Sequence, residues 1–95
     1  MAEMTLPPLV GTRRRARALL DELPAQLEHV TVYVDCRELL AGSESFADEL
    51  ILELLVERRA DAVVATSVGL EFAGYLEKVA GEHGVSPRLV LDRVP

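Results

Sequence analysis

Residues 30–35, which read VTVYVD, and residues 43–50, which read SESFADEL, decide the fold of this chain because the hydrophobic period changes between them. Three valines at alternate positions, with a threonine and a tyrosine between them, are typical of a β-strand. From Phe46 onward the apolar residues recur every three or four positions, which predicts an amphipathic helix that runs until Arg58 and Arg59. The two segments therefore predict a strand followed by a helix.

The start of this predicted helix carries two hydroxyl groups, from Ser43 and Ser45. Ser45 is the predicted N-cap. Its hydroxyl can accept a hydrogen bond from the backbone N–H of Asp48, and the Asp48 carboxylate can reach back to the N–H of Ser45. We therefore expect a capping box, with Asp in the position of Glu, at the positively polarised end of the helix.

The rest of the chain continues the alternation of helices and strands. Residues 13–23 predict a first helix with Thr12 as its N-cap. Residues 62–67 form a near-continuous apolar run, typical of a strand covered on both faces. Residues 69–80 predict a third helix and residues 88–91 a last strand. This order predicts an α/β domain with a mostly parallel sheet of three to four strands and helices packed against it.

A chain of 95 residues suffices for one domain. We assign residues 11–95 to that domain and residues 1–10 to an N-terminal extension. Three strands make a narrow sheet, so residues 5–10 either add a strand or leave an edge for a partner. Homodimerisation, or a structural subunit that self-associates through a sheet edge, therefore remains an alternative.

Net charge argues against nucleic acid as a partner. The chain carries −6 overall, and four arginines within residues 1–20 form its one basic cluster. These arginines open a helix without interleaved aromatic residues, so a solvated face explains them better than a phosphate-binding stripe does. No apolar run approaches the roughly 20 residues that a bilayer span needs. We expect no membrane contact and, with a single cysteine and no secretory signal pattern, a cytoplasmic location.

Polar side chains follow the ends of two predicted strands. Asp35 ends the first, and Thr66 and Ser67 end the second. In open α/β sheets the functional groups gather beyond the C-terminal ends of the strands, so these residues predict a polar cluster there. Cys36 lies beside them, but no histidine can be brought to it from the sequence, and we predict a buried thiol rather than a nucleophile.

An enzyme remains the second interpretation. The strand that ends at Asp35 resembles the opening of PIN-type nucleases, in which a strand-end aspartate holds a divalent metal together with other carboxylates. Only 60 residues follow Asp35, however, and the nearby acids Asp48, Glu49 and Glu53 lie along one helix, where solvation is the ordinary explanation. No histidine or cysteine spacing indicates a metal site, and no glycine pattern cradles a phosphate. We therefore expect no cofactor, metal or catalytic residue.

Three segments resemble one family. Gly-Thr-Arg at residues 11–13, the strand at 30–35 and the run SESFADEL at 43–50 are similar to the small bacterial STAS-like domains, relatives of the anti-anti-sigma factors. This resemblance, over about residues 11–92, implies a non-enzymatic module that binds a histidine-kinase-like ATPase of anti-sigma type. It also implies loss of affinity when a serine at this helix start is phosphorylated.

The phosphoacceptor that the resemblance implies falls on Ser43 or Ser45, and Ser45 is favoured because it directly precedes Phe46. The chain lacks the leading Asp and the Gly of the family pattern Asp-Ser-x-Gly, so binding carries over better than phosphorylation. We expect the partner surface on residues 37–45 and the first turns of the following helix, with apolar and acidic contacts. The expected partner-binding residues are Leu39, Leu40, Glu44, Asp48 and Glu49.

Overall fold

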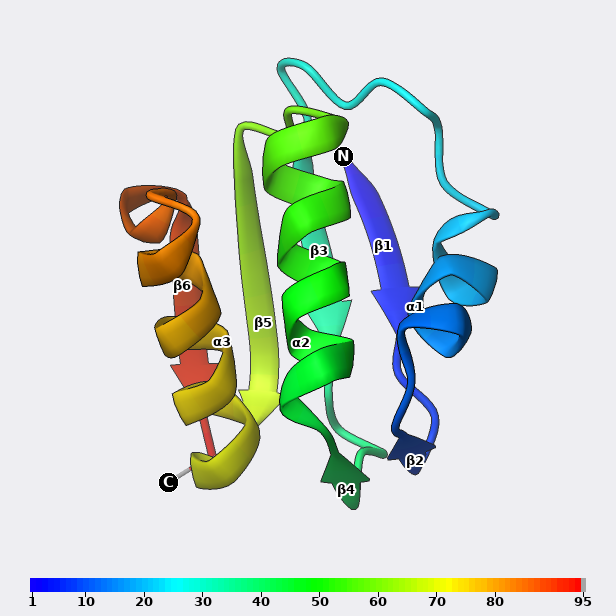
Figure 1. Cartoon of the computed structure of the whole chain (residues 1–95), viewed down its shortest axis with the longest axis vertical. Coiled ribbons are helices and arrows are strands. Elements are labelled where there is room, and N and C mark those ends of the chain that lie inside the picture. The colour runs from blue at the N-terminus through cyan, green and yellow to red at the C-terminus, as the bar shows by residue number, and fades with distance from the viewer. Residues whose placement is uncertain (95) are drawn as a thin grey trace.

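The computed structural model describes residues 1–94. Its main sheet has four parallel strands in the order β1-β3-β5-β6 (Figure 1). The strands are β1 (Ala2–Thr5), β3 (Thr31–Asp35), β5 (Ala62–Val68) and β6 (Leu89–Arg93). The predicted α/β fold with a mostly parallel sheet is confirmed. Its fourth strand, β1, overlaps the segment 5–10, where an extra strand was left open, only at Thr5. Residue 95, the last of the predicted domain 11–95, lies outside the described part.

Three helices and two short helical segments connect the strands. They are α1 (Arg13–Leu20), α2 (Glu44–Ile51), its π-helical continuation η1 (Leu52–Glu57), α3 (Leu70–Glu82) and the 3-10 turn η2 (Ser86–Arg88). Thr12 caps α1 as predicted, but the helix ends three residues before the predicted end. The guanidinium of Arg58 donates to the carbonyl oxygens of Leu20, at 2.8 Å, and Leu23, at 3.2 Å, and so satisfies the end of α1.

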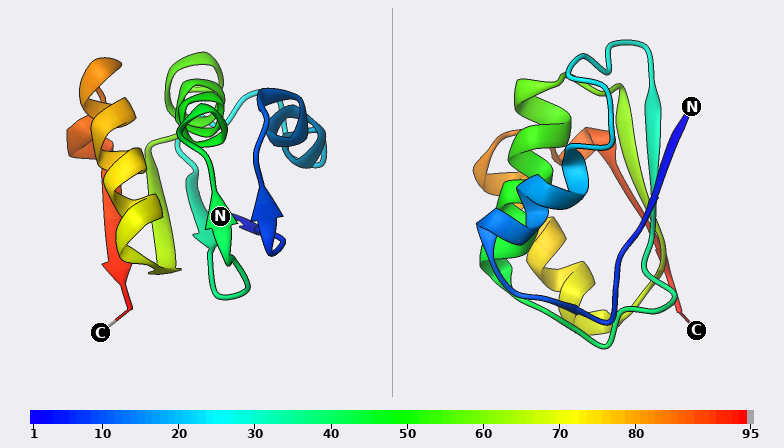
Figure 2. Two further views of the ribbon diagram at one scale, coloured as in Figure 1. Left: turned by 60° about the horizontal axis from the view of Figure 1, so that its bottom comes forward. Right: turned by 90° about the vertical axis from the view of Figure 1, so that its right-hand side faces the viewer.

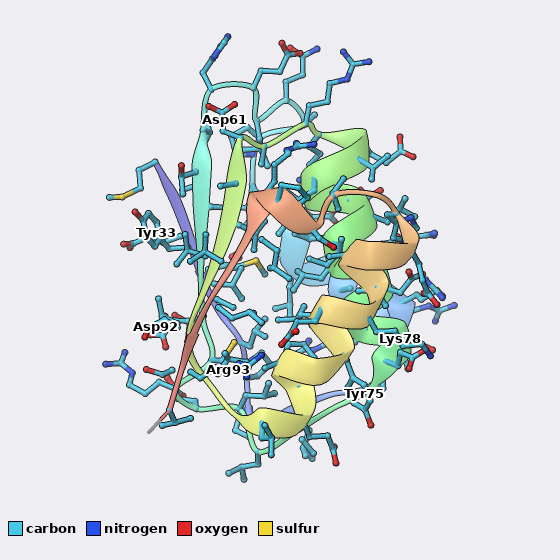
Figure 3. All side chains as sticks on the ribbon, turned by 90° about the vertical axis from the view of Figure 1, so that its left-hand side faces the viewer. Tyr33, Asp61, Tyr75, Lys78, Asp92 and Arg93 are labelled. Carbon is cyan, nitrogen blue, oxygen red and sulfur yellow. The ribbon has the colours of Figure 1, made fainter. Side chains whose placement is uncertain are left out.

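All three helices lie on one side of the sheet (Figure 2). Each new strand is added on the same side of the previous one, so right-handed crossovers place every helix on the same face. The prediction that β5 is covered on both faces is therefore wrong: Val63 and Ala65 are fully buried, but Val64 between them is partly exposed. Tyr33 and Asp92 extend from the face opposite the helices (Figure 3). Because the strand order never reverses, the sheet has no switch-point crevice of the kind that binds ligands in doubly wound folds.

A second, two-stranded parallel sheet lies beyond the C-terminal ends of β1 and β3 (Figure 1). It pairs β2 (Leu9–Val10) with β4 (Ala41–Gly42). The pairing ties the connection after β1 to the connection that leads into α2. Gly42 is required there, because a Cβ at this position would lie 2.8 Å from two ring carbons of Phe72.

The core lies between the helix layer and the main sheet. Its largest fully buried side chains are Phe46, Leu6, Leu20, Leu27, Leu50, Ile51, Leu54, Leu55 and Leu76. The one buried polar or charged side chain among residues 1–94 is Glu49. No helix in this range combines the length and the apolar character that crossing a membrane requires.

Candidate functional site

The start of α2 is held by Ser43 rather than Ser45. The Ser43 hydroxyl accepts from the backbone N–H of Phe46 at 3.0 Å and donates to the carbonyl oxygen of Gly11 at 2.9 Å. The backbone N–H of Ser43 donates to the carbonyl oxygen of Val10 at 3.0 Å. The predicted N-cap is therefore wrong by two residues, because pairing of β4 with β2 ends at Gly42 and the chain turns into the helix directly afterwards. Ser45 lies exposed in the first helical turn.

Asp48 does not close a capping box. Its carboxylate contacts the Arg13 guanidinium at 2.5 Å and Nε2 of His83 at 2.7 Å, so it joins α2 to α1 and to the end of α3. Burial by itself would raise the pKa of Asp48, but the hydrogen bonds from Arg13 and His83 outweigh that effect and hold the pKa below its usual range. The carboxylate is thus a structural anion under neutral conditions.

Glu49 also joins helices. It is 2 % exposed, and its carboxylate accepts from Nε of Arg17 at 2.9 Å and lies 3.5 Å from Arg13. The Gly-Thr-Arg and SESFADEL segments are thereby brought together, with Arg13 and Arg17 on α1 facing Asp48 and Glu49 on α2. Glu49 lies within the helix layer and offers no surface to a partner. Most of the Asp48 carboxylate is likewise used in its contacts with Arg13 and His83 and is not available to a partner.

Glu44 and Leu40 are the expected partner-binding residues that remain accessible. Glu44, half-exposed at the start of α2, pairs with Lys78 of α3 at 3.1 Å. Leu40 is exposed, whereas its neighbour Leu39 is partly buried against the core. Of the predicted partner surface, only Leu40 in the loop and the carboxylate of Glu44 are therefore accessible to a partner.

Two leucines that sequence reasoning did not select complete this surface. Leu9, Leu40 and Leu70 are 69 %, 83 % and 81 % exposed and come from β2, the loop before β4 and the first turn of α3. Ala41 and Gly42 line two shallow hollows at this end of the molecule, one with Leu9 and the other with Leu40 and Leu70. We call Leu9, Leu40 and Leu70 the leucine patch. Leu70 fits the apolar period of α3, so periodicity alone indicated a buried residue.

The strand-end residues form a separate, polar area. Thr5, Asp35 and Thr66 lie side by side in register on β1, β3 and β5. Asp35 pairs with Arg37 at 2.9 Å. Ser67 occupies a bulge in β5 with a φ of 53°. Across residues 1–94 no group of three His, Cys, Asp or Glu side chains is placed to hold a metal ion.

Cys36 is a buried thiol, 3 % exposed, with Sγ 3.8 Å from the carbonyl oxygen of Val34. Burial, with a smaller contribution from the negative charge of Asp35, raises its pKa to about 11. The thiol stays protonated at neutral pH, and a protonated, inaccessible thiol does not attack substrates.

Comparisons of the chain with protein-family models, curated proteins and solved structures gave no match. Its function is therefore inferred from its own residues. Ion pairs join the helices, the Cys36 thiol is buried, and three leucines from separate segments are exposed. Exposed apolar side chains that lie together are a feature of binding surfaces.

Proposed function

We propose that this chain is a non-catalytic, STAS-like protein-interaction module that binds a protein partner through the leucine patch. The exposure of three large apolar side chains from three separate segments at one end of the molecule carries the proposal. Exposed apolar side chains gathered in one place mark interaction surfaces, whereas scattered single ones need no explanation. The resemblance of the SESFADEL segment to anti-anti-sigma relatives supports a bacterial, cytoplasmic regulatory role.

The energetics suit a regulated contact. Complete burial of one leucine side chain is worth about 1.5–3 kcal/mol, so the patch supplies roughly 5–9 kcal/mol. Association itself opposes binding by an estimated 4–15 kcal/mol. Further contacts are therefore needed, and polar groups around the patch would supply them.

Phosphorylation of Ser45 would regulate this contact. Ser45 is exposed, whereas the Ser43 hydroxyl is used both as donor and as acceptor within the fold. A phosphate would add between −1.5 and −2 charges beside Glu44 and Asp48. The extra negative charge weakens docking of an acidic partner surface, which is the direction expected for an off signal. By the same resemblance, the proposed partner is a histidine-kinase-like ATPase of anti-sigma type.

The test compares capture of partners by matched variants. Tagged wild type, the double variant Leu40→Ser/Leu70→Ser and the control Val90→Ser are incubated with lysate of the native host, and bound proteins are identified by mass spectrometry. Val90 is a half-exposed apolar residue on the open face of the sheet, so its replacement removes similar surface elsewhere. We expect an anti-sigma-type ATPase on the wild type and on Val90→Ser, and its loss from the double variant. Equal capture by all three proteins would contradict the proposal.

A separate experiment tests whether Ser45 is phosphorylated. The purified chain is incubated with ATP and the captured kinase, and its intact mass is measured. We expect one added phosphate, absent in Ser45→Ala, and weaker partner binding by Ser45→Asp than by Ser45→Ala. An unchanged mass would remove the phosphorylation switch and leave the binding surface to be judged by the leucine variants.

A further inference from the structure

One edge of the main sheet is open. β1 pairs with β3 on one side and has no strand on the other (Figure 2, right-hand view). The backbone N–H of Leu6, which follows β1, donates to the carbonyl oxygen of Asp35 at 2.9 Å and therefore points toward β3. Backbone groups alternate along a strand, so those of Glu3 and Thr5 point away from β3. In the part of the chain that the structure describes, these two N–H groups and two carbonyls have no backbone partner.

A groove runs beside this open edge. It has a volume of about 480 Å³ and lies between β1 and the end of the α1 segment. Its lining residues are Glu3, Met4, Thr5, Leu19, Glu22 and Leu23. The apolar members, Met4, Leu19 and Leu23, are half-buried against the core, whereas the carboxylates of Glu3 and Glu22 are exposed. The groove thus combines an apolar floor with an acidic rim.

We propose that the β1 edge binds an extended peptide segment, in which apolar residues alternate with Lys or Arg, as a fifth strand of the sheet. The free backbone groups of Glu3 and Thr5 would bond the added strand. Side chains alternate between the two faces of a strand, so every second residue of the peptide reaches the apolar floor. The residues between them lie on the face of Glu3, where a cationic side chain meets a carboxylate. This site is distinct from the leucine patch and goes beyond the proposed function.

Charge decides against a second copy of the chain as the occupant. Pairing of two β1 edges around a two-fold axis would bring Glu3 and Glu22 of both copies into one shared groove. Like charges on adjacent strands oppose pairing. A basic segment gains from the same carboxylates, and an acidic segment does not.

Titration with defined peptides tests the site. The ¹⁵N-labelled full chain is titrated with acetyl-Lys-Val-Lys-Val-Lys-amide while amide shifts are followed by NMR. Two comparison probes are its Glu-Val-Glu-Val-Glu counterpart and a version N-methylated at every residue, which has no backbone N–H left to donate to a strand edge. We expect shifts centred on residues 3–5, 19 and 23, with binding of the two comparison peptides weaker by about tenfold or more. No binding, equal binding of the three peptides, or shifts centred elsewhere would overturn the proposal.

Variants of the chain distinguish loss of peptide binding at the β1 edge from loss of the folded structure. Thr5→Pro removes an outward N–H and no hydrogen bond to β3, and proline is tolerated on edge strands. It should abolish peptide binding without changing the circular dichroism spectrum. Glu3→Lys/Glu22→Lys should reverse the preference toward the acidic peptide, a result that does not depend on Thr5→Pro folding. Leu40→Ser should bind the basic peptide as the wild type does, so failure here is distinguishable from failure of the leucine patch. Dimers in sedimentation that Thr5→Pro dissociates would identify a second copy as the occupant and overturn the peptide site.

Discussion

The close approach of β4 to α3 makes Gly42→Ala a sharp test of the packing beneath the leucine patch. A Cβ at Gly42 would lie 2.8 Å from two ring carbons of Phe72 and 3.1 Å from Cγ2 of Val10. The Phe72 ring cannot simply swing away, because it is buried and packs against Phe46 with ring centroids 6.3 Å apart. The added methyl group must therefore displace packed atoms.

Forcing extra atoms into a packed core typically costs 1–3 kcal/mol, and we expect about 2 kcal/mol for Gly42→Ala. Gly74→Ala is the matched control. Gly74 lies exposed in α3, and a methyl group added there would meet nothing within 4 Å, so the same substitution should stabilise the helix by about 0.5–1 kcal/mol. Urea unfolding followed by circular dichroism gives both free energies.

A double-mutant cycle with Phe72→Leu identifies the cause. Leucine lacks Cε1, one of the two ring carbons nearest to the added methyl, and its δ carbons can move away by a change of rotamer. Gly42→Ala should therefore be less destabilising in the Phe72→Leu background, with a coupling energy above about 0.5 kcal/mol. Additive effects of the two substitutions, or equal effects of Gly42→Ala and Gly74→Ala, would refute the steric reasoning.

Three further predictions concern the helix cap and the titrating groups. Ser43→Ala should reduce the free energy of unfolding by about 1 kcal/mol and Ser45→Ala by much less, since only Ser43 caps α2; equal losses in urea unfolding would contradict this. Cys36 should resist thiol reagents at pH 8 until the chain unfolds. The pKa of this thiol is about 11 in the folded state, against 9.0 for an ordinary thiol. The free energy of unfolding should therefore fall as the pH rises from 9.0 to about 11, and Cys36→Ala should not show this decrease. Asp48 has a lowered pKa in the folded state, so its contribution is complete above about pH 4 and is lost as the pH falls further; Asp48→Asn should show a smaller decrease in thermal stability on acidification.

The three helices and the strands β3, β5 and β6 were predictable to within a few residues because their signals are local, whereas β1 was misplaced and the short strands β2 and β4 were missed. The alternating valines of β3 and the apolar period beginning at Phe46 depend only on which face of each element is buried. The N-cap was missed because two hydroxyls competed for it. Pairing of β2 with β4, two segments more than thirty residues apart, selected Ser43.

The candidate site was only half predictable. Leu40 was expected at the surface, but Leu9 and Leu70 were not, because exposure of an apolar side chain depends on whether another element happens to cover it. The acidic residues of α2 were expected to face a partner. Glu49 instead faces Arg17 of α1, a neighbour 32 residues away in sequence that no local pattern identifies.

The sequence by itself determined the alternation of helices and strands, the α/β class and the parallel sheet, since periodicity, capping residues and crossover handedness act over short stretches. Only the tertiary structure decided which charges pair, which leucines stay in water and that one face and one edge of the sheet remain open. Those outcomes depend on which distant segments are packed side by side, because a charge is satisfied, or an apolar side chain covered, only by whatever the fold places next to it.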